Sequence, residues 1–97
     1  MALIYVVEDD KNIQEIETFA LSGSGYETKG FDNAAQFYKA LAEKCPDLII
    51  LDIMLSDQDG ISIVKKLRDR EETNRIPILL VTAKTSETDK VKRLDSG

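Results

Sequence analysis

The chain has 97 residues, the size of one small domain, and its 42% hydrophobic and 32% charged residues are typical of a water-soluble globular protein. Its formal net charge of −5, with no histidine, makes it a poor electrostatic match for nucleic acid or an anionic membrane surface. No apolar run approaches the ~20 residues that a membrane-spanning helix needs. We therefore expect one domain over residues 1–97, and any DNA binding would belong to an output domain outside this chain.

The start of the chain and its single cysteine indicate the compartment. Met1-Ala2-Leu3-Ile4 contains no basic segment, and Glu8 interrupts the apolar stretch early, which argues against an ordinary signal peptide. Cys45 has no partner for a disulfide within the chain, which suits a reducing cytosol. We expect a cytoplasmic protein.

The first half of the chain alternates strand and helix patterns. Residues 3–7 form a continuous apolar run, typical of a strand buried on both faces. Residues 11–22 have the periodicity of a helix, which Ser22-Gly23-Ser24-Gly25 ends, and residues 26–30 predict a short polar strand near an edge. The apolar positions of this first helix are Ile13, Ile16, Phe19 and Ala20.

The second half repeats the alternation. Asn33 is placed to cap a helix over residues 34–43, and an apolar strand follows over 48–52. Gly60 opens a third helix, and Pro77 precedes a strand over 78–81. The inner faces predicted for the two helices are Ala34, Phe37 and Leu41, and Ile61, Val64 and Leu67. A last helix, capped by Thr85 or Ser86, completes a pattern that predicts a parallel sheet with helices on both faces.

Acidic residues follow two of the buried strands. Glu8-Asp9-Asp10 comes after the strand over 3–7, and Asp52 ends the strand over 48–52. If these strands are parallel neighbours, their carboxylates meet at the edge of the sheet where ligands bind in open α/β folds. Carboxylate oxygens are the ligands that Mg²⁺ prefers, so the sequence predicts a magnesium site.

Each of these polar residues also has a purely structural interpretation. The acids after the first strand favour a helix start, and Asp10 is placed to cap that helix. Asp52 could cap a turn, although Asp57 and Asp59 supply turn and helix-start residues downstream, with Gly60 giving conformational freedom. Thr82 is either an ordinary β-branched strand residue or a hydroxyl that donates to an anion near Asp52.

Five short motifs stand in a distinctive order along the chain. They are Val6-Val7-Glu8-Asp9-Asp10, Leu48-Ile49-Ile50-Leu51-Asp52-Ile53-Met54-Leu55, Asp59-Gly60, Ile76-Pro77-Ile78 and Val81-Thr82-Ala83. Together they resemble the receiver domain of bacterial two-component response regulators, and most closely receivers that precede a winged-helix DNA-binding domain. The resemblance implies a flavodoxin-like α/β three-layer sandwich whose parallel sheet has the strand order 2-1-3-4.

The resemblance also implies a function and roles for particular residues. The domain would be a signalling switch that accepts a phosphoryl group from a sensor histidine kinase onto Asp52, with Mg²⁺ as cofactor, and controls a transcriptional output domain. Asp9, Asp52 and the backbone carbonyl of Met54 would bind the metal, with Glu8 acting through water. Thr82 would contact the phosphoryl group and transmit the change. Such a domain assists its own phosphorylation and dephosphorylation but is not otherwise an enzyme.

Three features depart from the family pattern. Ser56 stands where proline is usual, and Arg93 stands where glycine is frequent. The sequence ends at Gly97, before the fifth strand and helix of the family, so we expect the fifth βα unit and its phosphoryl-contacting lysine to be absent. Self-association is then expected through the bare edge of the 78–81 strand or through the last helix. In the winged-helix receivers that the chain resembles, the face of that helix around Lys90, Val91 and Leu94 is a dimer surface.

Two other functions compete with this interpretation. The chain could be a receiver-like module that binds partners without being phosphorylated. It could also be a phosphohydrolase with an aspartyl nucleophile, but such enzymes need a second acid two residues further on, where this chain has Met54.

Overall fold

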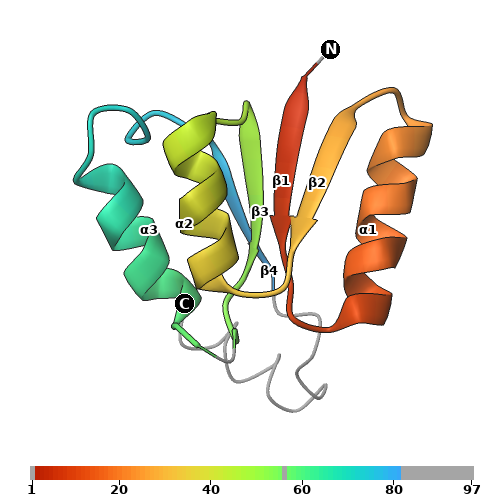
Figure 1. Ribbon diagram of the computed structural model, residues 1–97, viewed down its shortest axis with the longest axis horizontal. Helices are drawn as coiled ribbons and strands as arrows, with labels where there is room; N and C mark the ends of the chain where they lie inside the picture. Colours follow the sequence, from red (N-terminus) through yellow and green to blue (C-terminus); the bar gives the residue numbers. More distant parts are fainter. Residues whose placement is uncertain (1, 56, 82–97) are drawn as a thin grey trace, which may run out of the picture.

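The computed structural model describes residues 2–55 and 57–81, which form an alternating series of strands and helices (Figure 1). The elements in chain order are β1 (Leu3–Val7), α1 (Lys11–Gly23), β2 (Glu27–Phe31), α2 (Ala34–Glu43), β3 (Leu48–Asp52), α3 (Gly60–Arg68) and β4 (Ile78–Val81). The predicted elements are confirmed, with small shifts at the ends of α1 and β2. Thr82 and the expected last helix lie outside the described residues.

The four strands form one parallel sheet in the order β2-β1-β3-β4, as predicted. Val7 pairs with Phe31 of β2 on one side and with Leu51 of β3 on the other, while Asp52 pairs with Val81 of β4. Because all the strands run in the same direction, their carboxyl ends meet at a single edge. That edge carries the acidic residues.

The helices form the two outer layers of the sandwich. Figure 1 shows α1 on one face of the sheet and α2 with α3 on the other. Successive residues of a buried strand point to opposite faces, so each strand contributes to both layers. The larger core joins alternate residues of β1 and β3 to α2 and α3, through Leu3, Tyr5, Val7, Phe37, Ile49, Leu51, Ile63 and Leu67. The smaller core contains Ile4, Val6 and Ile50, with Leu21 of α1 packed against them.

The apolar positions of α1 do not form a buried face. Ile16 is 67% exposed and Phe19 is 82% exposed, whereas Gln14 is buried. The helix is turned by hydrogen bonds: the Gln14 side-chain amide donates to the carbonyl of Glu8 at 2.9 Å and to Asp32 Oδ1 at 3.1 Å. These bonds draw the Gln14 side of α1 toward the sheet and leave its apolar side in solvent.

The predicted face of α3 needs a smaller correction. Leu67 is buried as expected, but Ile61 is 47% exposed and Ile63 takes its place in the core. Asp59 caps the helix by accepting from the backbone N–H of Ile61 at 3.2 Å. This cap leaves Ile61 in the exposed first turn, while Ile63 and Leu67, one turn apart, face the sheet.

The other helix ends follow the sequence signals. Asp10 caps α1 by accepting from the N–H groups of Asn12 and Ile13, and Asn33 caps α2 by accepting from Gln36. Gly25 has φ of +96°, a left-handed conformation that glycine adopts at little cost, and it turns the chain after α1. None of the helices in the described part of the chain is long and apolar enough to cross a bilayer.

Candidate functional site

Three carboxylates converge at the carboxyl edge of the sheet. Glu8 and Asp9 directly follow β1, and Asp52 ends the neighbouring strand β3. One carboxylate oxygen from each lies within 4.8 Å of the others. Glu8 and Asp52 are fully buried and Asp9 is partly buried. The structure therefore places Glu8, Asp9 and Asp52 together, as the strand pattern predicts.

Three hydrogen bonds fix the position of Glu8. Its backbone N–H donates to the carbonyl of Phe31 at the end of β2, 3.0 Å away. Its Oε2 accepts from the N–H of Asp10 at 2.9 Å, and its carbonyl accepts from Gln14. Because backbone and carboxylate are both held, this acid is oriented before any ligand binds.

The loop after β3 folds back on Asp52. The N–H of Met54 donates to Asp52 Oδ1 at 2.9 Å, and the N–H of Gly60 donates to the carbonyl of Ile53, also at 2.9 Å. Met54 and Asp59 form an isolated antiparallel bridge across the loop. Met54 therefore lies beside the acidic cluster, with its backbone bonded to Asp52.

Gly60 is required in this loop because there is no room for a side chain at this position. A Cβ atom there would lie 2.7 Å from Ile53 Cα and 2.9 Å from the carbonyl oxygen of Asp52. The expectation that Gly60 supplies conformational freedom is wrong, because Gly25 is the only described glycine with a positive φ. The start of α3 can approach the backbone behind Asp52 only because residue 60 has no side chain.

A polar network beside the cluster was not foreseen. Gln14 joins Glu8 to Asp32, and Asp32 Oδ1 also pairs with Lys11 Nζ at 3.3 Å. The hydrogen bonds from Gln14 and then Lys11 lower the pKa of Asp32 below its usual value. A polar residue one turn after a capping aspartate was the available signal, but its partner Asp32, which directly follows β2, is visible only in the folded chain.

Asp57 plays a part that sequence reasoning also missed. We expected it to be a turn residue, yet its carboxylate accepts from the N–H of Ala34 at 3.0 Å and of Ala35 at 3.3 Å. It therefore caps α2, a helix that begins 23 positions earlier. No local pattern in the sequence encodes this contact.

Glu17 of α1 is a further acid on the sheet side of the molecule. It lies one turn before Leu21, and its Oε1 is buried with no hydrogen-bond partner among the described residues. Burial raises the pKa of Glu17, and the charge of Asp52 raises it further. The acidic cluster thus acts electrostatically on a group outside it.

The donor set suits a small divalent cation. Three carboxylates held this close repel one another, and burial removes the water that would screen them. A hard cation relieves both costs, and Mg²⁺ takes carboxylate and carbonyl oxygens while keeping several waters. The residues present therefore fit the predicted ion. Thr82, the remaining predicted site residue, lies outside the described residues.

The chain belongs to the response regulator receiver domain family, whose pattern matches residues 4–97. It is 37% identical to the phosphate regulon transcriptional regulatory protein PhoB of Pseudomonas aeruginosa and 38% identical to the DNA-binding response regulator MtrA of Mycolicibacterium smegmatis, each over 94 residues. These matches cover 97% of this chain but only 41% and 40% of those proteins. The chain therefore spans about two fifths of the length of the curated relatives it matches.

Solved structures share the fold. The signal receiver domain of a signal transduction histidine kinase from Syntrophus aciditrophicus matches with a TM-score of 0.82 and 29% identity, covering all of this chain and 74% of that one. The chemotaxis protein CheY4 of Vibrio cholerae matches with a TM-score of 0.81 and 26% identity, covering all of this chain and 81% of that one. The flavodoxin-like fold implied by the motifs is confirmed.

Proposed function

We propose that this domain is a phosphoacceptor switch that takes a phosphoryl group from a phosphohistidine of a sensor histidine kinase onto Asp52. The observation that carries the proposal is the convergence of Glu8, Asp9 and Asp52 at the carboxyl edge of the sheet. Membership of the receiver family supports it. In the reaction, an oxygen of Asp52 bonds to phosphorus as the bond from phosphorus to the histidine nitrogen breaks and its electron pair stays on the imidazole.

The chain's own residues would prepare Asp52 for this step. The N–H of Met54 holds one carboxylate oxygen, which orients the other for attack. Asp9, Asp52 and the carbonyl of Met54 would hold Mg²⁺, with Glu8 acting through a bound water. The ion would supply neutralisation of the charge on the transferred group. Thr82 would contact the phosphoryl group after transfer.

The wider setting of the switch is part of the proposal. DNA-binding relatives suggest that the domain controls a transcriptional output domain. We place it in the cytoplasm, where it would assist its own phosphorylation and dephosphorylation and catalyse no other reaction. Self-association remains a prediction, and it is supported by the exposure of Leu79 and Leu80 on β4, an edge strand of the described sheet.

The direct test is phosphorylation by a small donor. Incubation with acetyl phosphate and Mg²⁺ should add one phosphoryl group, detected by intact mass, and Asp52→Asn should abolish it. Asp59→Asn is the matched control, because Asp59 caps α3 and lies outside the carboxylate cluster. Labelling that survives Asp52→Asn would place the acceptor elsewhere, and no labelling of the unaltered chain would favour the binding-only module.

Metal binding is tested separately by thermal unfolding. Mg²⁺ at ten times its Kd should stabilise the unaltered protein by about 1.4 kcal/mol, because it binds the folded state and relieves carboxylate repulsion. Asp9→Asn should remove most of this gain. An equal rise in Tm with Mg²⁺ in Asp9→Asn would contradict the assigned ligand.

A further inference from the structure

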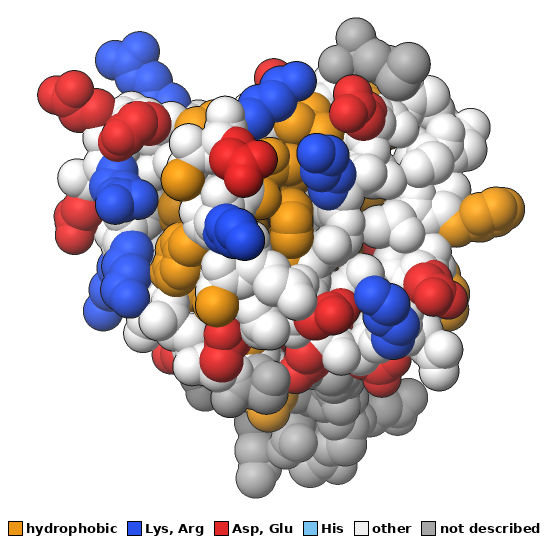
Figure 2. Space-filling model, in the orientation of Figure 1, with side chains coloured by type: hydrophobic (Ala, Val, Ile, Leu, Met, Phe, Trp, Pro, Cys, Tyr) orange, Lys and Arg blue, Asp and Glu red, His pale blue; other side chains and the backbone are white. Residues whose placement is uncertain are grey.

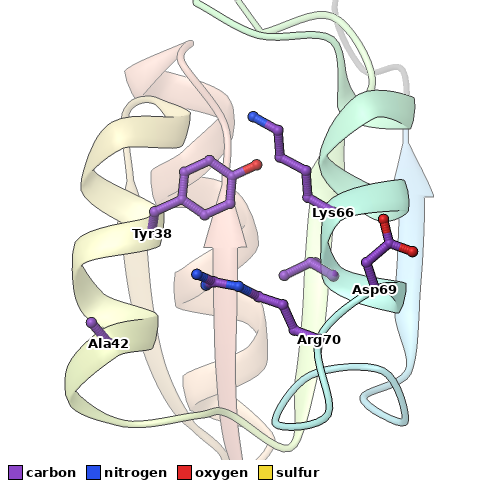
Figure 3. A pocket seen from close by; sticks show the side chains of 6 residues that line it. Tyr38, Ala42, Lys66, Asp69 and Arg70 are labelled. Carbon is purple, nitrogen blue, oxygen red and sulfur yellow. The ribbon is translucent and has the colours of Figure 1, made fainter.

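A second concave site lies between α2 and α3, on the face of the sheet opposite α1. It is a recess of about 550 Å³, lined by Tyr38, Ala42, Lys66, Leu67, Asp69 and Arg70 (Figure 3). None of these residues belongs to the acidic cluster. The proposed phosphorylation of Asp52 does not involve this recess. The side chains that line the recess therefore need a separate explanation.

Tyr38 forms one wall of the recess and is held in place. Its hydroxyl donates to Gln58 Oε1 at 2.7 Å, and its ring packs against Phe37 with centroids 5.7 Å apart. Lys66 Nζ lies 5.6 Å from the centre of the Tyr38 ring, within the range of a cation–π contact. The wall is therefore a fixed aromatic surface with a cation beside it.

Two cations converge on this aromatic wall. Figure 3 shows the side chains of Lys66 and Arg70 extending from the α3 side toward Tyr38. Burial raises the pKa of Tyr38, the positive charge of Arg70 lowers it, and Asp57 raises it further. The recess thus concentrates positive charge in a chain whose net charge is −5.

These two charges are not neutralised inside the described part of the chain. The ion pair found among those residues joins Lys11 to Asp32, and neither Lys66 nor Arg70 makes a side-chain hydrogen bond there. Asp69 lines the recess but is not within ion-pair distance of either cation. An anion that enters would meet two available donors.

The dimensions of the recess favour a small molecule. On α2 the lining spans Tyr38 to Ala42, about 6 Å along the helix axis; on the other side it runs from Lys66 and Leu67 near the end of α3 to Asp69 and Arg70 just beyond it. A volume of about 550 Å³ lies in the range of small-molecule sites. One ring with one charged substituent fits this footprint, whereas an extended peptide would run beyond it.

We propose that the recess between α2 and α3 binds a small aromatic anion, a carboxylate or a phosphate monoester. The ring packs against Tyr38 and the apolar floor at Leu67. The anionic group takes hydrogen bonds from Lys66 and from the guanidinium of Arg70, whose planar fork suits carboxylate and phosphate oxygens. This site is independent of Asp52 and of the proposed phosphorylation.

The test is an amide NMR titration of the full chain in a chelating buffer, which keeps metal out of the acidic cluster. Benzoate and phenyl phosphate are the probes, and they separate the carboxylate from the phosphate ester. At least one should shift the amides of Tyr38, Ala42, Lys66 and Arg70 and saturate. Inorganic phosphate, which lacks the ring, should bind at least several-fold more weakly than phenyl phosphate.

Variants then assign the contacts. Arg70→Gln should weaken binding roughly tenfold, the loss expected for one charge-assisted hydrogen bond, and Lys66→Gln should weaken it comparably. Arg75→Gln is the matched control, because Arg75 is exposed and does not line the recess. A well-dispersed spectrum of each variant confirms its fold.

Three results would overturn the proposal. The first is the absence of saturable shifts in the recess with either probe at millimolar concentration. The second is inorganic phosphate binding as tightly as phenyl phosphate. The third is an Arg75→Gln variant that loses as much affinity as Arg70→Gln, since the effect would then reflect overall charge.

Discussion

The two faces of the sheet are held in different ways. On the face covered by α2 and α3, aromatic and aliphatic side chains interlock: Tyr5 meets Phe31 edge-on at 4.9 Å, and Phe37 is fully buried. On the face covered by α1, the core is small, and Phe19 stands in solvent. Figure 2 shows a hydrophobic side chain projecting from the α1 side of the molecule.

The two faces therefore contribute differently: the α2–α3 face mainly stabilises the fold, and the α1 face mainly orients α1 and Glu8. Apolar burial on the α2–α3 face supplies most of the free energy of folding, because stabilisation scales with the apolar area removed from water. On the other face, hydrogen bonds from Gln14 set the rotation of α1 and hold the backbone of Glu8. We therefore expect substitutions of similar chemistry to have unequal effects on the two faces.

The largest effect should come from paired phenylalanine substitutions. Phe37→Ala should lower the free energy of unfolding by about 3–5 kcal/mol, because it opens a cavity in the larger core. Phe19→Ala should change it by about 0.5 kcal/mol or less, since that ring is already hydrated. Urea denaturation measures both, and equal losses would show that α1 is packed more tightly than the described residues indicate.

Paired glycine substitutions should give the next largest effect. Gly60→Ala should destabilise the protein by about 1–3 kcal/mol, because its Cβ meets backbone that cannot move without shifting the Asp52 loop. Gly23→Ala, at the end of α1, has no atom within 4 Å of the new Cβ and should be neutral or slightly stabilising. Thermal unfolding of the two variants measures this difference. A Gly60→Ala protein with the Tm of the unaltered protein would contradict the prediction.

The smallest effect concerns Glu17, the partly buried acid on the α1 face. Burial and Asp52 raise the folded-state pKa of Glu17 above its ordinary 4.5, so the folded state loses stability as the pH rises from 4.5 through that pKa. Glu17→Gln should therefore stabilise the protein at pH 7 by about 0.5 kcal/mol or less, because solvent screens this partly exposed carboxyl, and the advantage should disappear in acid.

Glu15→Gln is the control for this pH effect, because Glu15 is exposed on the same helix. Its unfolding free energy should follow that of the unaltered protein at every pH. A pH-independent difference for Glu17→Gln would mean that the carboxyl of Glu17 is not responsible.

Local patterns predicted the strands, the helix caps and the acidic edge. Asp10, Asn33 and Asp52 could be placed from the sequence because each depends on its immediate neighbours and on the common direction of parallel strands. The rotation of α1 could not be predicted, because it depends on a hydrogen bond from Gln14 to Asp32, a residue directly after β2. Apolar spacing favoured Ile61 as a core residue of α3, whereas the structure buries Ile63 and leaves Ile61 in the first turn after the Asp59 cap.

Distant contacts explain the remaining omissions. The cap that Asp57 places on α2 joins segments far apart in the sequence, and the crowding around Gly60 depends on how α3 approaches β3. Neither contact leaves a periodic signal. The recess beside Tyr38 likewise exists only once α2 and α3 lie side by side.

The attachment of Asp57 to α2 restricts how the length of this chain can change. Surface loops usually accept inserted or deleted residues. The segment over 53–59 is fastened at Met54 to Asp52, at Asp57 to α2 and at its far end by the bond between Gly60 and Ile53. An added residue would break at least one of these attachments, so insertions should be excluded here yet accepted at the turn around Gly25, which is solvent-exposed.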